Sequence, residues 1–140
     1  MTELSHRIKI FVFRMAGPEP HYLLLKPDQG IEALWGPLQG RLGFGDKLES
    51  AVRQRMLDKT GLAPTSRPID LDMPGHMPFG EEQIVEWTFG CQSIGEPDEE
   101  RMDELWSGYR WLGFGDAYPS LGFEADRAAI LRLHSRLSAA

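Results

Sequence analysis

The order of apolar and polar residues in the first part of the chain predicts a β-hairpin. Apolar and charged residues alternate from Arg7 and give way to a mostly apolar run that ends at Met15. Because successive side chains of a strand point to opposite faces, this segment is expected to be a strand that is buried on both sides towards its end. A second apolar run spans His21 to Lys26, and the residues between the two runs contain the Gly and Pro of a turn. One face of the first strand would carry Ile8, Ile10 and Val12, and the other would carry Phe11 and Phe13.

The strongest helical pattern lies in the middle of the chain. Gly61 stands where such a helix would end, and Asp46 with Glu49 three residues later is typical of an N-cap with a capping box. The pattern therefore predicts a helix that follows Asp46 and runs to about Thr60. Apolar residues at spacings of three and four would form its buried face: Leu48, Ala51, Val52 and Met56.

A glycine-rich segment precedes this helix. Gly40, Gly43 and Gly45 lie close together, which favours a loop with positive φ angles or a close approach of the backbone to another group. Amide groups exposed beside a helix N-terminus suit anionic ligands, because the N–H dipoles favour negative charge. The segment is therefore a candidate anion-binding loop.

The second half of the chain combines predicted strands and loops and ends in a helix. The final helix is expected from Glu124 to Leu137, and a short helical turn is expected at Asp116–Tyr118. Strands mixed with two helices, without an internal repeat, indicate one α/β (α+β) domain that spans residues 1–140. The other expected elements are strands at Ile69–Met73, Gln83–Gln92 and Leu105–Leu112, loops at Pro74–Gly80 and Gly95–Asp103, and apolar contacts of the last helix from Ala128, Ile130, Leu131, Leu133 and Leu137.

Composition and charge narrow the function classes. The net charge of -6 argues against a general nucleic-acid binder, which would carry a basic patch, but it is compatible with a local pocket for a small phosphorylated ligand. No apolar stretch reaches the roughly 20 residues that a membrane helix needs. Cys91 is the only cysteine, which excludes an internal disulfide and fits a reducing compartment. We therefore expect a cytoplasmic protein without nucleic-acid or membrane partners, and we interpret Cys91 as a buried strand thiol.

Residues 40–62 resemble the Nudix box, the motif G-x5-E-x7-R-E-U-x-E-E-x-G-U in which U is a bulky aliphatic residue. Gly40 and Gly61 have the spacing of its first and last glycines, Met56 and Leu62 occupy aliphatic positions, and Trp35 leads into the segment as a tryptophan often does in the family. Segments on both sides are also similar to the family. The resemblance covers nearly the whole chain and implies a Nudix-like α/β/α sandwich with a mixed sheet between helices.

The charged positions of the box depart from the family pattern. In the family the glutamates hold divalent metal ions that bridge a diphosphate, so the resemblance implies Mg²⁺ or Mn²⁺ as the cofactor of an active member. Here Asp46 replaces the first glutamate, and the three later glutamate positions hold Arg55, Asp58 and Lys59. Residues at i, i+3 and i+4 share one helix face, so this face carries two cations and one anion. Each close like-charge pair would oppose a metal ion by about 1–4 kcal/mol.

One hypothesis is a binding domain with a degenerate, catalytically impaired box. Arg55 and Lys59, beside the amides around Gly40, would hold the phosphate of a nucleotide-like ligand in place of the metal, and no cofactor would be needed. In its plainest form the domain is inactive, and Arg55, Asp58 and Lys59 are a local set of ion pairs on a helix.

A second hypothesis is an active, metal-dependent pyrophosphohydrolase. Asp46 and Asp58 would be its catalytic carboxylates, and Asp58 would bind Mg²⁺ or Mn²⁺ with the downstream glutamates Glu82 and Glu86. The substrate would be a nucleoside triphosphate or a compound linked to a nucleoside diphosphate.

A third hypothesis is an interaction domain, because members of the family often form homodimers. Four aromatic residues would then supply an interface; alternatively they pack in the core and rim of one domain. They are Trp87, Trp106, Trp111 and Phe114.

Overall fold

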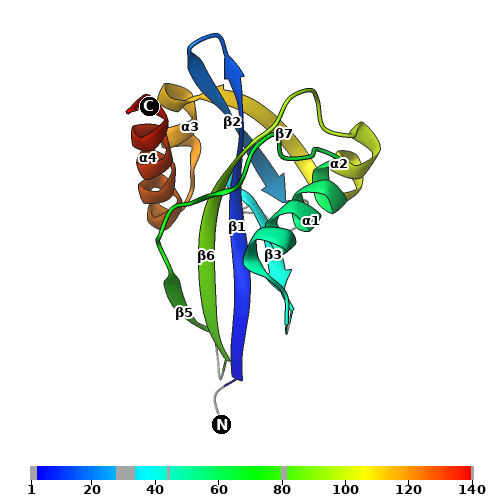
Figure 1. Ribbon diagram of the computed structural model, residues 1–140, viewed down its shortest axis with the longest axis vertical. Coiled ribbons are helices and arrows are strands. Elements are labelled where there is room, and N and C mark those ends of the chain that lie inside the picture. Colours follow the sequence, from blue (N-terminus) through cyan, green and yellow to red (C-terminus); the bar gives the residue numbers. More distant parts are fainter. Residues whose placement is uncertain (1–2, 28–33, 44, 80–81, 140) are drawn as a thin grey trace.

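A mixed β-sheet lies at the centre of the molecule (Figure 1). The computed structural model describes residues 3–27, 34–43, 45–79 and 82–139. None of the described helices is long and apolar enough to cross a membrane. The described strands are β1 (Glu3–Ala16), β2 (Glu19–Pro27), β3 (Leu38–Leu42), β4 (Ile69–Asp70), β5 (Gly75–Phe79), β6 (Glu82–Gln92) and β7 (Trp106–Gly113). The described helices are α1 (Leu48–Thr60), α2 (Glu99–Leu105), α3 (Phe114–Ser120) and α4 (Glu124–Ser138).

Strand β1 organises the sheet. It pairs in parallel with β6 along most of its length, and on its other edge it pairs antiparallel first with β3 and then with β2. The order through the sheet is β4-β6-β1-β2-β7, with β3 beside β1 and β5 beside β6. The β1–β2 pairing, in which Phe13 faces Tyr22, confirms the predicted hairpin. Because β3 and β2 pair with successive parts of β1, the sheet divides between them.

The alternation along β1 separates two cores, one on each face of the sheet. Ile8, Ile10 and Val12 pack with the buried residues of α1, whereas Phe11 and Phe13 pack with those of α4. Figure 1 shows α1 and α2 on one side of the sheet and α3 and α4 on the other. The predicted α/β/α arrangement with a mixed sheet is therefore confirmed.

Helix α1 ends as predicted but begins differently. Gly61 follows the helix with a φ of +77°, and Ala51, Val52 and Met56 are buried. The N-cap residue is Lys47, whose side chain makes no capping bond in the described structure. Asp46 instead accepts a hydrogen bond from the Gly43 N–H at 2.7 Å. The predicted capping box is wrong because the glycine-rich turn uses this carboxylate.

Two segments predicted as loops contain regular structure. Strand β5 lies within Pro74–Gly80, and Pro78 is tolerated because, among the described strands, β5 pairs with β6 alone and so forms an edge. Helix α2 begins inside the predicted acidic loop, where Asp98 accepts a hydrogen bond from the Glu100 N–H at 3.1 Å. Of the predicted 69–73 strand, only β4 is formed. The Pro and Gly of residues 27–30 also predict a turn, and residues 28–30 lie outside the described part of the chain.

Candidate functional site

The polar face of α1 brings Arg55, Asp58 and Asp46 together. The Arg55 guanidinium lies 3.8 Å from Asp46 Oδ2 and 4.0 Å from Asp58 Oδ2. Asp58 Oδ1 also accepts a hydrogen bond from the Gln54 amide at 2.8 Å. The two carboxylates predicted as catalytic therefore lie on either side of one guanidinium. All three charged side chains are partly exposed, so these pairs contribute little to stability.

Gly40 allows the stem of Arg55 to lie against β3. A Cβ atom added at Gly40 would lie 3.0 Å from Arg55 Cγ, and Arg55 Nε donates to the Arg41 carbonyl at 3.1 Å. Gly40 lies in strand β3, so the close approach of Arg55 to the backbone explains why a glycine stands there. The positive φ predicted for this segment occurs at Gly45, with +83°. Gly40 thus positions Arg55.

Lys59 lies at the boundary between this face and the interior. Its Nζ donates to the Gln39 carbonyl at 2.7 Å. Burial lowers the pKa of Lys59, and the neighbouring charges of Arg55 and Arg7 lower it further. An ammonium group has three donors, and within the described part of the chain the bond to Gln39 uses one of them, which leaves two for a ligand.

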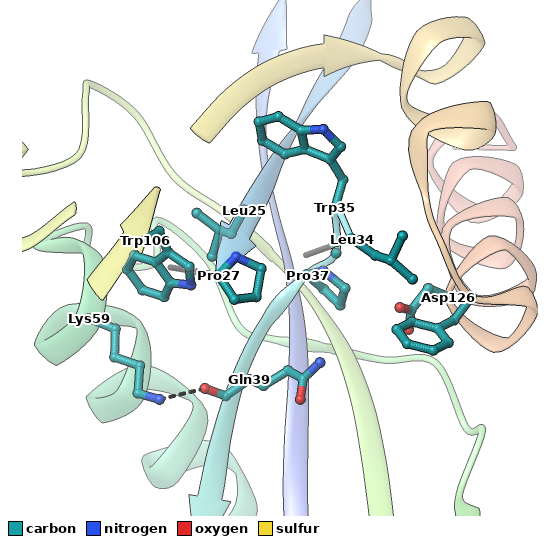
Figure 2. Close-up of a pocket in the computed structure, with 11 residues that line it drawn as sticks. Leu25, Pro27, Leu34, Trp35, Pro37, Gln39, Lys59, Trp106 and Asp126 are labelled. Atoms are coloured by element: carbon teal, nitrogen blue, oxygen red, sulfur yellow. Dashed lines mark hydrogen bonds between the residues drawn. The ribbon is translucent and has the colours of Figure 1, made fainter. Parts of the chain in front are cut away.

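A cavity of about 390 Å³ lies beside Lys59, at the place where the sheet divides. Figure 2 shows Lys59 of α1 on one side of it and Asp126 of α4 on the other. Most of the wall between them is apolar or aromatic, which is the usual character of a small-molecule site. The lining residues are Leu25, Pro27, Leu34, Trp35, Gly36, Pro37, Gln39, Lys59, Trp106, Phe123 and Asp126.

Glu86, a predicted metal ligand, lies on the opposite face of the sheet from Asp58. Its carboxylate is 3.5 Å from Lys9 Nζ, on the side of the sheet that α4 covers. Its neighbour Trp87 packs on the α1 side, as the alternation along a strand requires. The structure therefore does not bring Glu86 and Asp58 together. The side chain of Glu82 lies outside the described part of the chain.

The donor set on the α1 face does not fit a divalent cation in this arrangement. Such an ion prefers several anionic oxygens, but Asp46 and Asp58 are both paired with Arg55, and Lys59 adds a second positive charge. Among the side chains that the structure describes, no three His, Cys, Asp or Glu residues are grouped so that they could hold a metal ion.

The apolar pattern of the sequence did not indicate the acidic residue of the cavity. Asp126 is 1 % exposed, and it lies one helical turn before the buried Ala129 and Ile130 of α4. The predicted apolar residues Ala128 and Leu131 are exposed instead, so the buried face of α4 is turned relative to the prediction. Asp126 shares a helix face with Ala129 and Ile130, and a carboxylate on an apolar helix face was the signal that could have identified this residue.

The aromatic residues considered for an interface pack within the domain. Trp87, Trp106 and Trp111 are partly buried against the core on the α1 side, and Phe114 is partly buried against the core on the α4 side. Homodimerisation remains a prediction.

Comparison by sequence finds no relatives that identify the chain. No protein-family model matches the sequence. No curated protein matches it either.

Comparison by structure identifies the fold. A protein from Listeria monocytogenes, provisionally assigned as a Nudix hydrolase, matches with a TM-score of 0.80 and 13% identity over 96% of this chain and 94% of its own. An Ap4A hydrolase from C. elegans matches with a TM-score of 0.74 and 10% identity over 97% and 99%. The Nudix domain of Shewanella oneidensis NrtR, solved in complex with ADP-ribose, matches with 0.73 and 16% identity over 98% and 89%. The chain has the Nudix fold.

Proposed function

We propose that this protein binds a small, nucleotide-like phosphorylated ligand. The phosphate lies on the cationic side of α1, where Arg55 and Lys59 replace the acidic residues of the Nudix box, and the rest of the ligand occupies the adjoining cavity. The observation that carries the proposal is the position of Lys59, which lines the cavity and, among the residues that the structure describes, uses one of its three ammonium donors, for the bond to Gln39.

The chemistry of the face supports phosphate over metal. Hydrogen bonds between a cationic donor and a phosphate oxygen are short and strong, and Arg and Lys bind phosphate without a bridging ion. The Nudix domain that was solved with ADP-ribose supports a ligand of this class, because it has the same fold.

Titration calorimetry in EDTA with ADP-ribose, ADP and GMP tests the proposal. Lys59→Met should weaken binding at least about tenfold, since a hydrogen bond to a charged group contributes about 1.5–3 kcal/mol. Lys47→Met, at an exposed lysine beside the same helix, is the matched control and should bind as the native protein does. Absence of binding heat with all three nucleotides would overturn the proposal.

The alternative is a metal-dependent pyrophosphohydrolase. It is favoured by the presence of two carboxylates, Asp46 and Asp58, on the same face of α1, and it requires a metal ion to displace Arg55 from them. An assay of product release from nucleoside triphosphates and ADP-ribose with Mg²⁺ or Mn²⁺ separates the two functions. The binding proposal expects no turnover that depends on Asp58. Turnover that Asp58→Asn abolishes would instead establish the hydrolase.

A further inference from the structure

A second cavity lies on the side of the sheet that α4 covers. It has a volume of about 380 Å³ and lies between α4, β6 and the segment that leads into β5 (Figure 1). This volume is in the range of small-molecule sites. Lys9 lines this cavity, and the bond from Lys9 Nζ to Asp126 Oδ1, at 2.8 Å, joins its wall to that of the first cavity, which Asp126 lines. The proposed nucleotide site uses only the first cavity.

The charged side chains around the second cavity leave one negative charge in excess. Asp72 and Arg132 line it as an exposed acid and an exposed base, so their charges balance. Lys9 and Glu86 line it from the sheet. Lys9 Nζ is bonded to the buried Asp126 and lies 3.5 Å from the buried Glu86 Oε2, so one ammonium group serves two buried carboxylates. The excess negative charge therefore lies on the sheet side of the cavity.

Glu86 is the carboxylate that this arrangement leaves incompletely paired. It is 7 % exposed, and among the residues that the structure describes its Oε2 has no hydrogen-bond partner. A buried charge that is only partly paired is unfavourable for the protein. The Glu86 side chain lines the cavity, so a cation in the cavity would lie next to its charge although Oε2 itself is buried. Because charges attract over several ångströms in a low-dielectric interior, direct contact with Oε2 is not required.

The remaining lining favours an organic cation over a metal ion. The apolar part of the wall comes from Met73, Pro74, Ala125 and Ala129. A divalent ion requires several anionic oxygens, but the ammonium group of Lys9 already lies beside Glu86. An alkylammonium ion carries a single charge, and it can bury its carbon chain against the apolar wall while its head group faces the carboxylate.

We propose that the second cavity binds a small primary amine. Its ammonium group lies beside Glu86, and its carbon chain lies against the small residues of α4 that line the cavity. With a second ammonium group present, Lys9 is left to Asp126 alone, so each buried carboxylate has its own cation. The site goes beyond the proposed function and does not depend on it, because Arg55 and Lys59 do not line this cavity.

Chemical-shift titration of the full chain with n-pentylamine, 1-pentanol and pentanoate tests the site. The three probes share one chain length and differ in the charge of the head group. Pentylamine should bind at least about tenfold more tightly than pentanol, and pentanoate should not bind. The amide signals that move should include those of Thr88 and Ala129, which line the cavity. Equal affinity for the amine and the alcohol would overturn the proposal.

Two variants separate charge from space. Glu86→Gln leaves Lys9 paired with Asp126 and should abolish the preference for pentylamine over pentanol. Ala125→Leu fills part of the cavity and keeps every charge, so it should weaken pentylamine binding at least about tenfold. Ala128→Leu is the matched control, because this exposed residue of the same helix does not line the cavity, and it should bind as the native protein does.

Two further outcomes would contradict the site. Pentylamine binding that survives both Glu86→Gln and Ala125→Leu would reflect general attraction to a chain with a net charge of -6. Absence of pentylamine binding to the native protein would overturn the proposal as well. Either result leaves the proposed nucleotide site standing, because these titrations contain no nucleotide.

Discussion

Single residues decide the chemistry of this Nudix fold. The resemblance to the Nudix box aligns Lys59 with a glutamate, and the Gln39 carbonyl of β3 accepts a hydrogen bond from its ammonium group. Burial is the main cause of its lowered pKa, and Arg55 and Arg7 add to it. A phosphate beside Lys59 would supply the negative charge that these surroundings lack, so it would favour the protonated lysine.

Phosphate binding should therefore depend on pH through Lys59. Affinity should fall as the pH rises through the lowered pKa of Lys59, which lies below the value of about 10.4 for an ordinary lysine. Because bound phosphate raises that pKa, binding should also take up protons in this range. Calorimetry with ADP in EDTA from neutral to alkaline pH, in buffers of different ionisation enthalpy, measures both effects.

Lys59→Arg is the control for this pH dependence, because its guanidinium stays charged over the whole range. Its affinity should vary little with pH. The same alkaline loss of affinity in both proteins would assign the effect to another group.

At the scale of elements, the sequence predicted the segments that bury a regular apolar face. The alternation in β1 and the three-to-four spacing in α1 are clear for this reason, and both proved correct. Helix α2 was not predicted because it buries only Met102 and so has no regular apolar face. Strand β5 was not predicted because it contains a proline, which an edge strand can accommodate. The predicted capping box was wrong because the Asp46 carboxylate could accept a hydrogen bond either from the start of the helix or from the preceding turn. The local pattern could not show that the Gly43 N–H would be the donor.

The end of α1 should be sensitive to a single methyl group. Gly61→Ala forces a side chain into a φ of +77° and places its Cβ 2.9 Å from Asp98 Cβ, so we expect a loss of unfolding free energy of roughly 1–2 kcal/mol or more. Urea denaturation measures it.

Gly115→Ala is the matched control for Gly61→Ala, because a Cβ there meets nothing within 4 Å and α3 does not require a positive φ at this position. It should leave the stability unchanged or raise it slightly. Equal stability of both variants would show that the Gly61 turn adapts.

At the scale of the whole molecule, the cavity is built from segments that are far apart in the chain. Lys59 could be identified from the box because its neighbours in sequence define the motif. Asp126, Lys9 and Gly36 come together only because β3 and β2 pair with successive parts of β1 and α4 covers that face. The sequence therefore identified the α1 residues of the candidate site, whereas the residues on the opposite wall could be identified only from the tertiary structure.

Cys91 should report on unfolding of the whole domain. It is fully buried in the core on the α1 side, and burial raises the pKa of its thiol to about 12. At pH 8 the thiolate fraction would be on the order of 10⁻⁴, compared with roughly a quarter for an ordinary cysteine. A colorimetric thiol reagent should react with one equivalent in urea and negligibly with the native protein. Rapid reaction of the native protein would contradict the packing of β6 described above.

The dependence of ligand binding on metal tests the central claim most directly. Calorimetric titration of ADP into the protein, first in EDTA and then in excess Mg²⁺, compares the two kinds of phosphate site. If Arg55 and Lys59 hold the phosphate themselves, ADP binds in EDTA, and Mg²⁺ leaves the affinity unchanged or weakens it by neutralising the phosphate. Binding that appears only when Mg²⁺ or Mn²⁺ is added would contradict the account.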